Sequence, residues 1–158
     1  MSNLESLGTD PLSAVAPIRL LLVEDDPGDV LITREALEQS KLLHHLDVVG
    51  NGEEAMAFLR HEGEFADATS PDLVLLDLNL PRKDGKEVLA EVKGDPELSH
   101  IPVIVLTTSE ADTDVLDTYR LHANAFITKP VDFERFHDVV RRIDDFFLTV
   151  VRLPKRTD

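Results

Sequence analysis

Short apolar runs recur along the chain from Ile18 onward, and each ends at a polar residue. The runs are Ile18–Val23, Leu73–Leu76, Val103–Leu106 and Ala125–Ile127, with Leu46–Val49 as a weaker fifth. Continuous apolarity over four to six residues is typical of strands that are covered on both faces, as in a parallel sheet. The pattern therefore predicts five buried strands.

Stretches with helical spacing lie between these runs. In Pro27–Ser40 the spacing places Val30, Leu31, Ala36 and Leu37 on one side of a helix. Helices are also predicted over Glu53–His61, Lys86–Lys93 and Asp112–Leu121, and from an N-cap at Asp132 to about Val150.

Five strand–helix units in succession predict an α/β fold with right-handed crossovers. We expect a doubly wound five-stranded parallel sheet in the flavodoxin-like order 2-1-3-4-5, with five helices and an extended C-terminal helix. Residues 1–17 are expected to be a flexible leader, residues 18–151 one folded domain, and residues 152–158 a short tail.

The charge balance narrows the classes of partner. The chain has 16 basic and 31 acidic residues, a formal net charge of -15, and no cysteine. Such an acidic surface repels phosphate backbones and anionic lipid, so we expect neither nucleic acid nor a membrane as a partner. No apolar run approaches the roughly 18 residues of a membrane span, and the N-terminus lacks signal-peptide features, so a cytoplasmic location is expected.

Charged and hydroxyl side chains stand where the predicted strands end. Glu24 and Asp25 follow the first strand, Asp77 the third, Thr107 the fourth and Lys129 the fifth. In open α/β sheets ligands bind beyond the carboxyl ends of the strands, so these side chains are expected to converge.

Three clustered carboxylates require a neutralising cation, and Mg²⁺ is the natural candidate, with Mn²⁺ as the alternative. The backbone carbonyl of Asn79 would complete its shell. Lys129 would add a fixed positive charge, and Thr107 a hydroxyl donor. This set predicts a pocket for a phosphoryl group on Asp77, because phosphoryl transfer needs mainly positioning and charge neutralisation.

Four segments carry a resemblance to response-regulator receiver domains. They are LLVEDDP (21–27), LVLLDLNLPRKDG (73–85), PVIVLTTSEAD (102–112) and AFITKPVD (125–132). The resemblance runs from about residue 18 to 151. It implies a two-component system in which a histidine kinase phosphorylates the chain, and in which the receiver catalyses only its own phosphotransfer and dephosphorylation.

The resemblance also implies a role for each matching position. Asp77 resembles the phosphoacceptor, Glu24 and Asp25 the acidic pair that holds the metal, and Asn79 the residue that gives a backbone carbonyl. Thr107 and Phe126 resemble the switch pair, and Lys129 the lysine that precedes a cis proline, here Pro130. Glu24 departs mildly from the family pattern, in which aspartate is commoner.

Two further segments resemble stand-alone receivers that partner bacterial phytochrome-type histidine kinases. These are HEGEFADATSPDLVLLDLNLPRKDG and DFFLTVVRLP. Only residues 152–158 follow the expected domain, so the output is expected to be a contact with a downstream protein or a phosphotransfer partner.

The expected last helix is longer than the strands of the expected sheet. At 1.5 Å per residue it spans roughly 28 Å, against about 17–20 Å for a strand of five or six residues. Its overshooting end is apolar and includes Phe146, Phe147, Leu148, Val150, Val151 and Leu153. An exposed apolar patch usually marks an interface, so a homodimer through this end is predicted. The alternative is that the end folds back over its own domain.

Two other functions compete with the receiver. A phosphatase that forms an aspartyl-phosphate would want a second aspartate two residues after its nucleophile, and Asn79 occupies that position. An interaction scaffold that is never phosphorylated would share the fold and need none of the chemistry.

Overall fold

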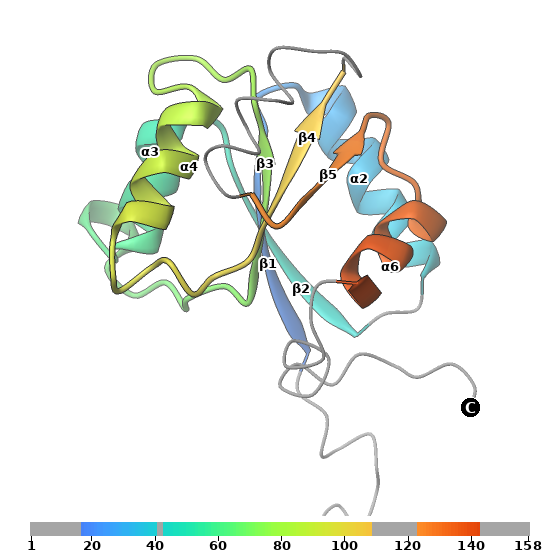
Figure 1. Cartoon of the computed structure of the whole chain (residues 1–158), viewed down its shortest axis with the longest axis horizontal. Helices are drawn as coiled ribbons and strands as arrows, with labels where there is room; N and C mark the ends of the chain where they lie inside the picture. The colour runs from blue at the N-terminus through green and yellow to red at the C-terminus, as the bar shows by residue number, and fades with distance from the viewer. Residues whose placement is uncertain (1–16, 41–42, 109–122, 143–158) are drawn as a thin grey trace, which may run out of the picture.

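The computed structural model describes residues 17–40, 43–108 and 123–142. Its centre is one five-stranded sheet in the order β2-β1-β3-β4-β5, with every pair parallel (Figure 1). The strands are β1 (Ile18–Val23), β2 (His44–Val49), β3 (Leu73–Asp77), β4 (Val103–Thr107) and β5 (Ala125–Thr128). The predicted doubly wound, flavodoxin-like topology is confirmed.

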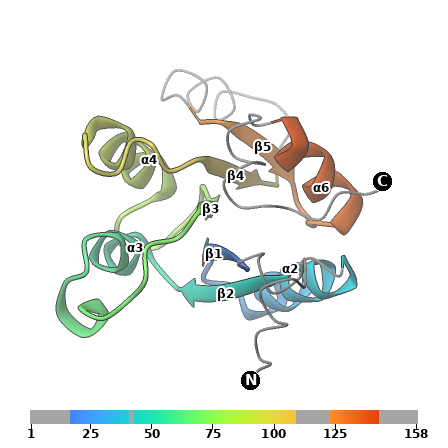
Figure 2. The same cartoon turned by 90° about the horizontal axis from the view of Figure 1, so that it is seen from below.

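Helices cover both faces of the sheet. They are α2 (Pro27–Gln39), α3 (Gly52–Leu59), α4 (Gly85–Gly94) and α6 (Phe133–Arg142), with a short 3₁₀ turn, η2 (Gly63–Phe65). Figure 2 shows α3 and α4 on one side of the sheet and α2 and α6 on the other. The helix predicted over 112–121 lies outside the described residues, as do the extension of the last helix beyond residue 142 and its apolar end from Phe146 to Val151.

Acidic caps fix where three of these helices begin. Asp26 caps α2 by accepting from the Gly28 amide, and Pro27 occupies the first turn, where its missing N–H costs nothing. Asp84 and Glu87 form a reciprocal capping box at α4. The Asp132 carboxylate accepts from the Arg135 amide at 2.9 Å, as expected for the N-cap of α6.

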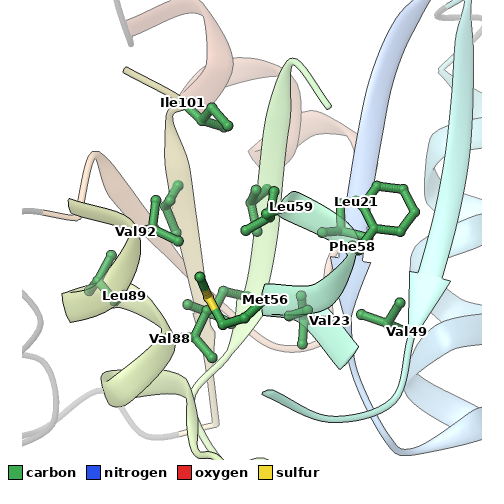
Figure 3. Close-up of a cluster of buried hydrophobic side chains, with 14 of the residues drawn as sticks. Leu21, Val23, Val49, Met56, Phe58, Leu59, Val88, Leu89, Val92 and Ile101 are labelled. Atoms are coloured by element: carbon green, nitrogen blue, oxygen red, sulfur yellow. The ribbon is translucent and has the colours of Figure 1, made fainter. Parts of the chain in front are cut away.

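The core lies in two layers, one on each face of the sheet. One layer joins alternate strand residues to α2 and α6, and its members include Leu20, Leu22, Leu75, Ile104, Ala36, Leu37 and Phe136. The other joins the remaining strand residues to α3 and α4 (Figure 3), and its members include Leu21, Val23, Met56, Phe58, Val88 and Leu89. Apolar side chains on both faces explain why the central strands read as continuous apolar runs.

One sequence prediction about α2 is wrong. The helical spacing predicts Leu31 on the apolar side of this helix with Val30, Ala36 and Leu37, but Leu31 is 55% exposed. The residues that the sheet buries are Thr33, Ala36 and Leu37. At 100° per residue these positions form one arc with Val30, and Leu31 projects from the opposite side. No helix among the described residues is long and apolar enough to cross a membrane.

Candidate functional site

Strand register brings the candidate residues to one edge of the sheet. Val23 pairs with Leu76, so the residues that come next, Glu24 after β1 and Asp77 at the end of β3, lie at the same level of the sheet. Asp77 pairs with Leu106, and the next residue of β4 is Thr107. Thr107 pairs with Thr128, which directly precedes Lys129. The residues that end four strands therefore meet at the carboxyl edge of the sheet.

Glu24, Asp25 and Asp77 form a carboxylate cluster. One carboxylate oxygen from each lies within 4.8 Å of the others. Glu24 and Asp77 are buried, whereas Asp25 is exposed. In an octahedral Mg²⁺ shell with bonds of about 2.0–2.1 Å, neighbouring oxygens lie about 3 Å apart and opposite ones about 4 Å apart. The spacing of at most 4.8 Å is close to these values, and carboxylate oxygens are ligands that hard cations prefer, so the donor set fits a small hard cation.

Lys129 faces this cluster with its ammonium group. Its Nζ lies 2.7 Å from Glu24 Oε1, 2.9 Å from Asp29 Oδ2 and 3.4 Å from Asp77 Oδ2. The backbone fixes the start of the side chain, because the Lys129 amide donates to the Thr107 carbonyl at 2.8 Å. The peptide bond between Lys129 and Pro130 is cis.

Burial and charge shift the pKa values of Glu24 and Lys129. Burial raises the pKa of Glu24, and the charge of Asp77 adds to the rise, while the hydrogen bond from Lys129 opposes it. Burial alone would lower the pKa of Lys129, but hydrogen bonds to Glu24 and Asp29 and the charge of Asp77 outweigh it and raise that pKa. Lys129 therefore stays charged, and one ammonium faces several carboxylates, which is an environment that favours a further cation.

The loop after β3 is pressed closely against Asp77. The Asn79 amide donates to Asp77 Oδ1 at 3.3 Å, and the Gly85 amide donates to the Leu78 carbonyl at 3.0 Å. A Cβ atom on Gly85 would lie 2.4 Å from the Asp77 carbonyl oxygen. Asn79 is thus placed beside the cluster, and the use of its carbonyl as a metal ligand stays a prediction.

The predicted switch residues occupy two neighbouring strands. Thr107 is buried at the end of β4. Phe126 lies on β5 opposite Val105, is half-buried, and packs against the core layer that faces α3 and α4. Thr107 and Phe126 thus lie on two paired strands that lead from the carboxylate cluster to β5. Their roles as switch residues stay predictions.

Asp29 is the site residue that reasoning from strand ends missed. It lies in the first turn of α2 and reaches Lys129, which is 100 residues away in sequence. An acidic residue in a first helical turn is ordinarily explained by the helix dipole, so its position alone gave no signal of a second partner.

Comparison with known proteins agrees with the geometry. Residues 20–141 match the model of the response regulator receiver domain. Response regulator Rcp1 of Synechocystis sp. is 46% identical over 138 residues, which are 87% of this chain and 94% of Rcp1. The structure of a phosphorylated cyanobacterial phytochrome response regulator, RcpA, is 48% identical with a TM-score of 0.72, and the match covers 89% of this chain and 100% of RcpA.

The Mn²⁺-bound form of Rcp1 is also similar, at 45% identity and a TM-score of 0.70, over 88% of this chain and 100% of that structure. These likenesses confirm the predicted resemblance to stand-alone receivers associated with phytochromes. The chain belongs to the family of response regulator receiver domains.

Proposed function

We propose that this chain is a response regulator that accepts a phosphoryl group on Asp77 from a histidine kinase. The observation that carries the proposal is the meeting of Asp77, Glu24 and Asp25 within 4.8 Å, with the Lys129 ammonium beside them. A buried carboxylate beside a cation site and a fixed ammonium has what phosphoryl transfer requires, which is positioning and charge neutralisation.

In the proposed reaction an Asp77 carboxylate oxygen attacks the phosphorus atom of a phosphohistidine. An O–P bond forms, the donor's P–N bond breaks, and the imidazole nitrogen keeps the electron pair. Lys129 lies within ion-pair distance of Asp77 and would donate to a phosphoryl oxygen. Thr107, at the end of the adjacent strand, would donate its hydroxyl to another.

The Glu24, Asp25 and Asp77 carboxylates would hold Mg²⁺ or Mn²⁺, with the Asn79 carbonyl as a further ligand. When bound, the metal would neutralise charge on the phosphoryl oxygens. The Mn²⁺-bound form of Rcp1 supports this assignment, because that protein is 45% identical to this chain.

The similarity to RcpA, a phytochrome response regulator, supports a phytochrome-type histidine kinase as the donor. The protein would act in the cytoplasm, catalyse only its own phosphotransfer and dephosphorylation, and pass the signal to a downstream protein or phosphotransfer partner. Movement of Thr107 toward the phosphoryl group, followed by Phe126, would alter the surface around β5.

We also propose a homodimer through the apolar residues that include Phe146, Phe147 and Val150. The support is the apolar character of these residues in the sequence, since an exposed patch of apolar side chains usually marks an interface. Sedimentation at micromolar concentration compares the full chain with a chain trimmed after Phe146. A full chain that is monomeric, and that loses nothing on trimming, contradicts the dimer.

The test of the phosphorylation proposal is incubation with acetyl phosphate and Mg²⁺, followed by mass spectrometry of the intact chain. We expect one phosphate per chain, absent from Asp77→Asn and present in Asp67→Asn, which removes an exposed carboxylate from the loop before β3. Turnover of the donor with no phosphate retained on the chain would instead indicate a phosphatase, and neither turnover nor retained phosphate an interaction scaffold.

A further inference from the structure

The Lys129 ammonium is shared among three carboxylates. It has three protons, and the oxygens of Glu24, Asp29 and Asp77 lie 2.7, 2.9 and 3.4 Å from its nitrogen. The longest contact is the one to Asp77, so the nitrogen lies closer to the other two groups. These two shorter contacts oppose any shift of the ammonium toward a phosphoryl oxygen on Asp77.

Asp29 differs from the other two partners in its surroundings. Among the described residues, the acidic group that fits a metal comprises Glu24, Asp25 and Asp77 and leaves Asp29 out. The Asp29 side chain is 29% exposed, against 1% for Glu24 and 5% for Asp77. Water can replace the lysine as a partner of Asp29 far more readily than as a partner of the two buried groups.

The backbone holds Asp29 in place. It is the third residue of α2, after the Asp26 cap and Pro27, and the Val30 amide bonds to the Asp26 carbonyl at 3.0 Å. The carboxylate is thus carried on a capped helical turn and is not on a mobile loop. Its ion pair with Lys129 joins the start of α2 to the end of β5.

We infer that Asp29 is a positioning residue that draws the Lys129 ammonium away from Asp77 and yields it when a phosphoryl group arrives. The kinetic part of this inference rests on the proposed function. Because Asp29 competes with phosphoryl oxygens for one ammonium, and adds negative charge beside the site, its carboxylate slows the capture of an anionic phosphodonor.

The test compares three variants in their second-order rate constant for phosphorylation by acetyl phosphate. Asp29→Asn keeps an acceptor oxygen and loses the charge, and we expect its rate constant to rise about threefold or more. Asp29→Glu restores the charge and should return the rate constant toward that of the unmodified chain.

Asp26→Asn is the matched control. It removes the same charge from the same turn, an asparagine still caps the helix, and no ion pair joins Asp26 to Lys129 in the described structure. We expect its rate constant to stay within about twofold of the unmodified chain, because an exposed charge is largely screened. A rate constant for Asp29→Asn that equals that of this control, or falls below it, overturns the inference.

A second measurement does not depend on phosphorylation. In ¹H–¹⁵N spectra of the lysine ammonium groups, the Lys129 protons should exchange with water faster in Asp29→Asn than in Asp26→Asn. If the unmodified chain takes up no phosphate, the proposed function fails, yet faster exchange in Asp29→Asn still supports the positioning role. Identical exchange in the two variants refutes it.

Discussion

Replacement of Asp77 by asparagine should stabilise the metal-free protein, although this substitution removes a charged partner of Lys129. The carboxylate oxygens of the cluster lie no more than 4.8 Å apart, and at that limit, with an effective dielectric constant near 20, two charges repel by about 3.5 kcal/mol, whereas the Lys129–Asp77 pair at 3.4 Å attracts by about 5 kcal/mol. Asp77 is repelled by two carboxylates and attracted by one ammonium. The repulsions outweigh the attraction by about 2 kcal/mol, and solvent around the exposed Asp25 reduces this to about 1–2 kcal/mol.

Urea unfolding in the presence of EDTA measures this difference. Asp67→Asn is the control, because it changes the net charge equally at an exposed position far along the chain from the cluster. We expect a higher midpoint for Asp77→Asn than for either the control or the unmodified chain. Equal midpoints for the two variants would mean that the cluster carries no excess repulsion.

Addition of Mg²⁺ should reverse the order of stability. An ion that binds only the folded chain stabilises it by RT ln(1 + c/Kd), where c is the Mg²⁺ concentration, and the unmodified chain offers one more carboxylate ligand than Asp77→Asn does, so its Kd should be lower. The gap between the two should therefore close as the Mg²⁺ concentration rises, and at high Mg²⁺ the unmodified chain should be the more stable. A gap that does not change with Mg²⁺ would contradict the assignment of these residues as ligands.

Three further substitutions test the surroundings of the site. Gly85→Ala brings a Cβ to 2.4 Å from a backbone oxygen and should lower the free energy of unfolding by about 2 kcal/mol or more, which thermal unfolding measures. Gly94→Ala is the control, because open space surrounds Gly94, and it should cause no such loss. Lys93→Met removes hydrogen bonds to two carbonyls and to Asn124, and we expect a loss of about 1–3 kcal/mol in urea unfolding, with no loss refuting their contribution. The hydrogen bond from Lys83 lowers the pKa of Glu91, so its stabilisation is present above the ordinary carboxylate range and is lost as the pH falls through the lowered pKa. Glu91→Gln should cost under about 1 kcal/mol near neutral pH and less near pH 4, as measured by urea unfolding at both, and a cost that grows with acid would contradict the pairing.

The sheet could be predicted from sequence because its central strands are buried on both faces. Leu20, Leu21, Leu22 and Val23 are all almost inaccessible to solvent, so burial left an uninterrupted apolar run. At the sheet edge the signal weakened, since β2 begins two residues earlier than predicted, at His44, where backbone pairing needs no apolar side chain. The orientation of α2 was misjudged at Leu31 for a related reason: an apolar residue on an exposed face resembles one that belongs to the core.

The carboxylate cluster was predictable for a geometric reason that does not extend to Asp29. Parallel strands in register bring the residues that follow them to one edge, so Glu24 and Asp77 could be placed together from the strand pattern alone. Asp29 reaches the same site from a helix, and which side chain Lys129 meets there depends on how α2 packs on the face of the sheet that it shares with α6. Strand ends therefore predict the residues of the carboxylate cluster, whereas the Asp29 partner of Lys129 follows from tertiary packing. The comparison of Asp29→Asn with Asp26→Asn separates these two contributions, since both lie in one turn and only one touches the lysine.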